Sequence, residues 1–137
     1  MRAANVKAEV IAVGIKTFDL QYTSHQMTLI NATNITIEIH KYACQLFEQL
    51  WDGTAIRHLG IHTSRLKDNI DMRKLDMFDT TDYEKLEMMD ATVDTIRRRY
   101  GNDAVKRAAF VGNKIDHMSG GISREKRSVD YKKMKIE

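Results

Sequence analysis

The side chains that could do chemistry recur at alternate positions along three short segments of the chain. They are hydroxyl, amide, imidazole and amino groups set among small residues: Lys16 near Ala12 and Gly14, then Ser24, Gln26 and Thr28, and finally His58, His62 and Ser64 around Gly60. None of these positions holds a carboxylate, although the chain has 19 acidic residues. Such groups contact phosphate and sugar oxygens without distinguishing one base from another. One interpretation of the pattern is therefore non-covalent binding to a nucleic-acid backbone.

The same pattern has other interpretations. Any antiparallel sheet with one solvent-facing side shows polar residues on that side, and three strands offer few positions. The pattern alone does not choose between a binding surface and a solvated one. A ferredoxin-like domain that binds a small molecule is a third interpretation, but it requires a concave apolar pocket, and nothing in the sequence indicates one.

The residues show no arrangement typical of an enzyme active site. There is no glycine-rich phosphate loop, no Gly-x-Ser-x-Gly motif and no cysteine and histidine pair of recognisable spacing. His58 and His62 would lie on one face of a strand roughly 13 Å apart, which is too far to share a metal ion. We therefore expect neither catalytic residues nor a metal or cofactor site in this chain. Cys44, the only cysteine, cannot form an intrachain disulfide and is expected to pack inside the fold.

Length and charge limit the class of protein. The chain has 137 residues, of which 42% are hydrophobic and 30% charged, and its net charge is +3. This is enough for one modest domain with an appendage, and the mildly basic balance permits a nucleic-acid partner. No apolar run approaches the roughly 20 residues of a membrane-spanning helix, and the first residues lack the apolar stretch of a signal peptide. We therefore expect a cytoplasmic protein.

A sheet must hold the polar positions, and the apolar pattern predicts one. Alternating residues predict a strand at residues 6–16 and another at 23–30, which together form an antiparallel hairpin. A third alternating segment, residues 55–64, predicts a further strand. Between the hairpin and this strand, apolar residues recur with helical period over residues 35–50. We therefore expect an α+β fold, with the helix on one face of the sheet and the polar positions on the other.

Local signals predict where the helices begin and end. Asn34 is the expected N-cap of the first helix, and Gly53 is its expected stop. Thr81 and Glu84 fit a capping box that opens a second helix. The remaining expected segments are a linker at 67–81, a helical tail at 82–112 with a short second helix near 103–111, and a disordered tail at 113–137.

Several stretches share their order and spacing with a known family. SHQMTL (24–29), ATNITIEIHKYACQLFEQLWDG (32–53) and AIRHLGIHTSRL (55–66) resemble the C-terminal little finger domain of Y-family, lesion-bypass DNA polymerases of the bacterial DinB/UmuC (ImpB/MucB/SamB-like) type. DATVDTIRRRYGNDAVKRA (90–108) resembles the tails of the same polymerases. The resemblance implies a partial little finger domain over residues 1–66, with part of a split βαββαβ-like arrangement.

The resemblance implies a role for the polar positions. In that family the little finger lays its open sheet face in the major groove of duplex DNA and contacts phosphates on both strands. The resemblance therefore implies a role in DNA damage repair and the SOS response, at the bacterial nucleoid. The role would fall on Ser24, Gln26, Thr28, Arg57, His58 and His62, beside Lys16 and Ser64 from the pattern above. Family members often have Arg or Lys in place of His58 and His62. We therefore expect sequence-independent binding that is weaker and depends more on pH near neutrality.

The segment KLDMF, residues 74–78, resembles the Gln-Leu-x-Leu-Phe peptide with which many bacterial members bind the sliding clamp. Lys74 stands in place of glutamine and Asp76 at the variable position, while Leu75, Met77 and Phe78 match the apolar anchors. A flexible ligand concentrates its binding energy in a few side chains. The resemblance implies clamp docking, either beside DNA binding or as the main role of a non-catalytic interaction module. The alternative is that these apolar side chains fold back on the domain or on the next helix.

The resemblance also implies parts that the chain lacks. The family's palm, whose carboxylates bind Mg²⁺, lies N-terminal to this region, so we expect no polymerase activity from the chain alone. In the split fold the family's first strand sits between the last strand and its neighbour. Without that strand we expect unpaired edges and an uncovered part of the core. We expect a second copy of the chain, by edge pairing or swapping, or the helix near 83–100, to fill the gap.

Overall fold

The computed structural model describes residues 1–69, 73–74 and 76–112; the predicted disordered tail at 113–137 lies outside them. Within these residues the elements are strands β1 (Val6–Thr17), β2 (Tyr22–Thr33) and β3 (Ile56–Asp68), helices α1 (Thr36–Leu50) and α2 (Tyr83–Tyr100), and 3-10 turns at Arg2–Ala4 and Ala108–Phe110. This confirms the predicted α+β class. The chain divides within α2 into two compact units, Met1–Thr95 and Ile96–Glu137.

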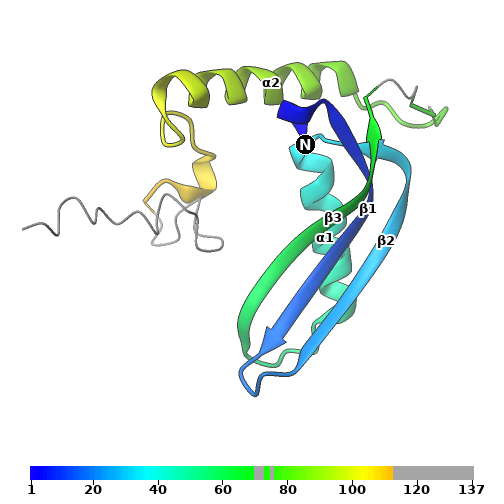
Figure 1. Ribbon diagram of the computed structural model, residues 1–137, viewed down its shortest axis with the longest axis vertical. Helices are drawn as coiled ribbons and strands as arrows, with labels where there is room; N and C mark the ends of the chain where they lie inside the picture. Colours follow the sequence, from blue (N-terminus) through cyan, green and yellow to red (C-terminus); the bar gives the residue numbers. More distant parts are fainter. Residues whose placement is uncertain (70–72, 75, 113–137) are drawn as a thin grey trace, which may run out of the picture. The chain divides into compact units, whose positions relative to one another are not determined.

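β1 is the central strand of the sheet, whose order is β2-β1-β3 with both pairs antiparallel (Figure 1). The β1–β2 hairpin closes where the Thr17 N–H donates to the Gln21 carbonyl (2.9 Å). β3 pairs directly with β1, from Val6 opposite Asp68 to Thr17 opposite Ile56. The predicted gap between the last strand and its neighbour is therefore wrong. β3 takes that place itself, because one antiparallel partner satisfies the backbone of β1 as well as another would.

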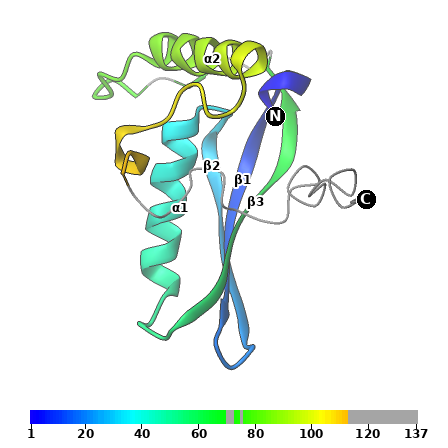
Figure 2. The same ribbon diagram turned by 90° about the vertical axis from the view of Figure 1, so that its left-hand side faces the viewer.

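The hydrophobic core lies between α1 and one face of the sheet (Figure 2). Its buried members are Ile11, Val13, Ile15, Leu29, Ala43 and Leu46. They combine the alternate residues of the strands with the helical stripe of α1, as the periodicity predicts. Burying one large aliphatic side chain stabilises the fold by roughly 1.5–3 kcal/mol, so this layer is the main source of stability.

Cys44 is exposed, so its predicted burial is wrong. α1 turns Ala43 and Leu46 toward the sheet, and Cys44 therefore falls on the solvent side of the helix. Its Sγ lies 3.6 Å from Nε2 of His40, one turn earlier. The helical period decides burial here, against the general preference of free cysteine for the interior.

β3 extends beyond the cover of α1. Leu59 and Ile61 pair with Ile15 and Val13, so they point to the core face as predicted. α1 lies over β1 and β2 (Figure 2), and each of the two β3 side chains remains 52% exposed. The core is therefore partly uncovered, although no strand gap causes it. The α2 residues of the first unit, 83–95, leave Leu59 and Ile61 exposed.

The start of α1 depends on a distant residue. Ile35, not Asn34, is the N-cap, and no side chain of this segment caps it. Asn34 instead donates to the Val6 carbonyl (3.5 Å). The first-turn N–H of Thr36 donates to a carboxylate oxygen of Asp90 in α2 (2.7 Å). The predicted Asn34 cap is therefore wrong, because a tertiary contact supplies the acceptor that a local cap usually provides.

The start of α2 is capped by a residue that the sequence analysis passed over. Oδ1 of Asp82 accepts a hydrogen bond from the Lys85 N–H (3.0 Å). Aspartate is as good an N-cap as threonine, and Asp82 stands directly before the first helical residue. The predicted capping box of Thr81 and Glu84 is therefore wrong, although the helix itself is where we expected it.

The described part of the second unit has little regular structure. The helix expected near 103–111 is reduced to the 3-10 turn Ala108–Phe110. After the end of α2, the Arg97 guanidinium donates to the Val105 carbonyl (2.9 Å), which folds the chain back on the last turn of the helix. The hydrogen bond from Arg97 uses the Val105 carbonyl, which a helix at residues 103–111 would need for its own backbone hydrogen bonds.

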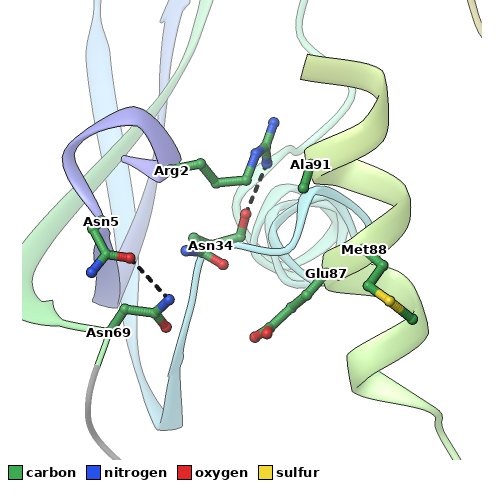
Figure 3. Close-up of a pocket in the computed structure, with 7 residues that line it drawn as sticks. All are labelled: Arg2, Asn5, Asn34, Asn69, Glu87, Met88 and Ala91. Atoms are coloured by element: carbon green, nitrogen blue, oxygen red, sulfur yellow. Dashed lines mark hydrogen bonds between the residues drawn. The ribbon is translucent and has the colours of Figure 1, made fainter. Parts of the chain in front are cut away.

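Arg2 fastens the first residues of the chain to α2. Its guanidinium donates to both carboxylate oxygens of Asp94 (2.6 and 2.9 Å), to Asp90 (3.3 Å), to the Asn34 carbonyl (2.9 Å) and to Thr36 Oγ1 (2.9 Å). The hydrogen bond with Asp94 raises the pKa of Arg2, although burial opposes it. Beside this cluster lies a pocket of about 320 Å³ (Figure 3), lined by Arg2, Asn5, Asn34, Asn69, Glu87, Met88 and Ala91. The first turns of α2 are thus held at the N-terminal end of α1.

Replacing Asp90 by alanine tests this junction. Asp90 is 5% exposed, and its loss leaves the Thr36 N–H and part of the Arg2 guanidinium without an acceptor. We expect about 1–3 kcal/mol of destabilisation in urea unfolding, with faster amide hydrogen exchange at Thr36. The control is Met88→Ala on the same helix, where the side chain is 63% exposed and about 0.5 kcal/mol or less is expected. Equal stability of the two variants would contradict the assignment.

Candidate nucleic-acid interface

The cross-strand register assembles the predicted polar positions on one face of the sheet. Directly paired residues of an antiparallel sheet point to the same side. Between Val10 and Lys16 the register has no shift, and every second residue of β1 lies between one residue of β2 and one of β3. These rows of three are Val10 with Thr28 and Ser64, Ala12 with Gln26 and His62, Gly14 with Ser24 and Gly60, and Lys16 with Tyr22 and His58. We call this surface the polar face. It lies opposite the core residues Ile11, Val13 and Ile15.

The polar face is open to solvent. Its exposed polar side chains are Ser24, Gln26, Thr28, His58, His62 and Ser64, and Lys16 is half-buried. The twelve positions in the rows include no carboxylate. α1 packs on the opposite side of the sheet and leaves this side free. The arrangement offers hydrogen-bond donors to an anionic ligand without a like charge to repel it.

Arg57 is the one predicted residue that the register does not place in these rows. A register shift separates Lys16 from Thr17, so that Thr17 pairs with Ile56 and Arg57 stands between two pairs. Arg57 is exposed at the edge of the polar face rather than within it. Its long side chain makes it suited to a contact at the rim, but strand alternation does not direct it there.

His58 and His62 come closer together than their strand positions suggest. Their Nε2 atoms lie 3.6 and 3.4 Å from the point where a Cβ on Gly60 would stand. Both imidazoles therefore lean over Gly60, and the expected separation of roughly 13 Å describes only the backbone. The glycine leaves a small niche between the two rings.

Tyr22 is a residue of the polar face that the sequence analysis missed. It pairs with Lys16, and its side chain is 58% exposed. Its ring lies across Gly14, where an added Cβ would stand 2.3 Å from the Tyr22 hydroxyl oxygen. The alternation of Ser24, Gln26 and Thr28, continued two residues toward the hairpin turn, predicts Tyr22 on the same face. Tyr22 adds a phenol hydroxyl and an aromatic ring to this surface.

The acidic residue of β1 is neutralised. Glu9 pairs with Lys67 of β3, with 2.9 Å between the carboxylate and Nζ. The hydrogen bond from Lys67 lowers the pKa of Glu9, so the carboxylate is ionised at neutral pH and its charge is balanced. This end of the sheet therefore adds little negative potential to the polar face.

Met77 and Phe78 form a second exposed feature. They are 92% and 87% exposed. The Asp76 carboxylate accepts a hydrogen bond from the Phe78 N–H (3.1 Å), and the Asp76 carbonyl accepts one from the Asp79 N–H (3.1 Å). We call residues 76–79 the apolar turn. Its two apolar side chains do not fold back on the domain, while Leu75, the other predicted anchor, lies outside the described residues.

The described ranges contain neither a candidate metal site nor a candidate membrane-spanning helix. Among residues 1–69, 73–74 and 76–112, no group of three or more His, Cys, Asp or Glu side chains is arranged to hold a metal ion. In the same part of the chain, no helix has the length and apolar character needed to cross a bilayer.

Known proteins resemble the chain over most of its length. Residues 1–77 match the impB/mucB/samB family C-terminal domain. The chain is 34% identical to DNA polymerase IV of Clostridium acetobutylicum over 111 residues, which cover 81% of the chain and 28% of that protein. It is 31% identical to DNA polymerase IV 2 of Bacillus subtilis over 111 residues, covering 79% and 26%. It is 27% identical to the putative UV-damage repair protein UvrX of Bacillus subtilis over 99 residues, covering 72% and 24%.

These matches cover most of the chain but only a small part of each relative. The chain spans about a quarter of the length of the curated relatives it matches. No solved structure matches it.

Proposed function

The chain belongs to the impB/mucB/samB family, whose C-terminal domain matches its residues 1–77, and on this basis we propose that it is a DNA-binding part of a bacterial lesion-bypass DNA polymerase. The polar face grips the sugar-phosphate backbone of duplex DNA and does not read base sequence. Relatives named DNA polymerase IV and a putative UV-damage repair protein support a role in DNA damage repair. The chain contributes binding rather than catalysis.

One observation carries this proposal: the exposed rows of hydroxyl, amide and imidazole groups contain no acid. A solvated face in a chain with 19 acidic residues would ordinarily include both signs of charge. Phosphate contacts need donors and are weakened by a neighbouring carboxylate, and such contacts orient DNA without reading its sequence. The composition of the face thus fits a phosphate backbone better than it fits water alone.

The dimensions of the face also support a duplex. Neighbouring strands lie about 4.8 Å apart, so the backbones of three strands span about 10 Å. The major groove of B-DNA is about 12 Å wide and admits an α-helix or a two-stranded β-ribbon, so two of the three strands can enter it together. The imidazole nitrogens of His58 and His62 that approach Gly60 add hydrogen-bonding groups to the middle of this face.

The chain is not proposed to carry the polymerase chemistry. Phosphoryl transfer needs Mg²⁺ held by carboxylate oxygens. The described residues form no group of three or more His, Cys, Asp or Glu side chains that could hold a metal ion. We propose that other parts of such a polymerase hold Mg²⁺.

We also propose that the chain docks on the sliding clamp. The exposure of Met77 and Phe78, at 92% and 87%, is the observation that favours this second function. Two adjacent apolar side chains on a charged segment are costly in water unless a partner buries them. Lys74 stands where the family peptide has glutamine, so the apolar side chains supply most of the affinity.

We further propose that a second copy of the chain covers the outer edge of β3. An antiparallel pair centred on Gly60 sets Leu59 opposite Ile61 of the other copy, and both side chains are now 52% exposed. The same register sets Arg57 opposite Thr63, whereas centring on Ile61 would set it opposite Arg65. The register centred on Gly60 is favoured because it pairs the two apolar side chains and keeps Arg57 away from Arg65 of the other copy.

The first test of DNA binding uses two charge changes on one strand. Gln26→Glu adds a negative charge to the polar face, and His25→Glu adds one to the opposite face of β2, since His25 pairs with Val13 of the core face. We expect the first to weaken duplex binding about fivefold in fluorescence anisotropy, because one added charge near a phosphate costs about 1 kcal/mol. The second should have little effect. Equal losses would remove the polar face as the binding surface.

Salt dependence provides an independent check on wild-type protein. If Lys16 and Arg57 neutralise about two phosphates, raising salt from 50 to 200 mM lowers the affinity roughly tenfold. Scrambled duplexes of equal length should bind alike. An affinity that salt leaves unchanged would exclude backbone binding.

Clamp docking is tested with Leu75→Ala/Phe78→Ala. We expect at least about a 30-fold loss of binding to immobilised Bacillus subtilis sliding clamp, because anchor residues of an interface each contribute about 2 kcal/mol or more. DNA binding should not change. The control is Phe18→Ala, since Phe18 is 67% exposed outside the apolar turn. No clamp binding by the wild-type chain would refute this function.

Self-association is tested by light scattering at increasing protein concentration. Ile61→Lys should shift a dimer to monomer, because it places a charge opposite Leu59 of the other copy. Ile37→Lys, at a position 43% exposed on α1, should leave the dimer intact. A wild-type chain that stays monomeric at high concentration overturns the proposal.

A further inference from the structure

The apolar turn is held from both sides by contacts with the folded domain. It lies between β3 and α2 (Figure 1), and residues before and after it are anchored. The sequence predicts a linker at residues 67–81, with the apolar side chains on a flexible segment. The described contacts show instead that its base is closed.

Arg73 forms the first anchor. Its guanidinium makes two hydrogen bonds to the Glu38 carboxylate in the first turn of α1, one of them at 3.2 Å. The guanidinium carbon also lies 3.4 Å from the ring centroid of Tyr83, the first residue of α2. Burial lowers the pKa of Arg73, but the hydrogen bond and charge of Glu38 outweigh this and raise it. A buried carboxylate and an aromatic ring thus enclose one cation.

Lys74 forms the second anchor through its backbone. The Lys74 N–H donates to Oδ1 of Asn31 (2.7 Å), and Nδ2 of Asn31 donates to the Lys74 carbonyl (2.9 Å). One side-chain amide of β2 therefore satisfies both backbone groups, as a paired strand would. The Lys74 side chain remains exposed.

The far side of the turn is anchored through Asp79. Its carboxylate accepts hydrogen bonds from the Thr81 N–H (3.0 Å) and from the Tyr83 hydroxyl. Hydrogen bonds from Thr81 and Tyr83 lower the pKa of Asp79 to about 2, so it is ionised in any ordinary assay. Tyr83 thus contacts both ends of the segment, through its ring to Arg73 and its hydroxyl to Asp79.

We propose that Asn31, Glu38, Arg73 and Tyr83 are positioning residues that present Met77 and Phe78 as a preformed turn to an apolar pocket on the sliding clamp. We call these four residues the loop base. This inference rests on the proposed clamp docking and specifies how the chain achieves it. The apolar side chains contact the partner, and the loop base sets their position.

The physical reason is conformational entropy. A free peptide loses backbone and side-chain freedom when it binds, and that loss reduces its affinity. The loop base restricts the segment before binding, which compensates for the missing glutamine at Lys74. The anchors engage the Lys74 backbone and the Arg73 side chain but leave Met77 and Phe78 in solvent. The contacts therefore present these side chains rather than mask them.

The test removes the loop base without touching the apolar side chains. Asn31→Ala deletes both hydrogen bonds to Lys74, and Arg73→Lys keeps the charge but loses the paired contact with Glu38. The matched control is Gln45→Ala, which deletes an exposed side-chain amide on α1. All variants are full-length chains, and DNA binding by each shows that the sheet is folded.

Two measurements, Lys74 amide exchange and clamp affinity, distinguish the positioning role of the loop base from clamp docking itself. In Asn31→Ala the Lys74 amide should exchange about tenfold faster by NMR, and in Gln45→Ala it should not change. Affinity for immobilised Bacillus subtilis clamp should fall about threefold to tenfold in Asn31→Ala and Arg73→Lys. Unchanged or tighter clamp binding, with faster Lys74 exchange, overturns the positioning role and leaves docking standing. No binding by the wild-type chain refutes both.

Discussion

The first unit depends on β1 being paired along both of its edges. Because its two neighbours are antiparallel and in register from Val10 to Lys16, the odd-numbered residues of this part of β1 face α1 and the even-numbered residues face the other side. Ile11, Val13 and Ile15 therefore enter the core together. A slip of one residue would exchange the two sets and expose the core, so the same apolar burial that stabilises the fold also fixes the composition of the polar face.

Local periodicity carried most of what could be predicted. The strands, α1 and the shared face of Gln26, Thr28 and His62 all follow from repeats of two or 3.6 residues. Two errors are local, because Cys44 falls on the solvent side of α1 and Asp82 rather than Thr81 caps α2. Other errors fall where a distant residue decides. Asn34 does not cap α1 because Asp90 accepts the Thr36 N–H instead, and no local pattern reveals a partner 54 residues away.

The candidate site divides in the same way. Most of the polar face could be read from alternation, but the convergence of His58 and His62 over Gly60 depends on side-chain rotamers. The apolar turn was visible as Met77 and Phe78 in a charged stretch. Its anchoring was not, because Asn31 and Lys74 are 43 residues apart and neither carries a signal of the other.

The bond between Arg2 and Asp94 has a consequence for how the protein is made. The partners are 92 residues apart, so during synthesis Arg2 leaves the ribosome long before the carboxylate that accepts its hydrogen bonds. The sheet and α1 can assemble in the meantime, since β3 ends at Asp68. Synthesis in this direction thus completes the contacts of Arg2 last, and a nascent chain stalled before Asp90 would leave Arg2 without both of its carboxylate partners.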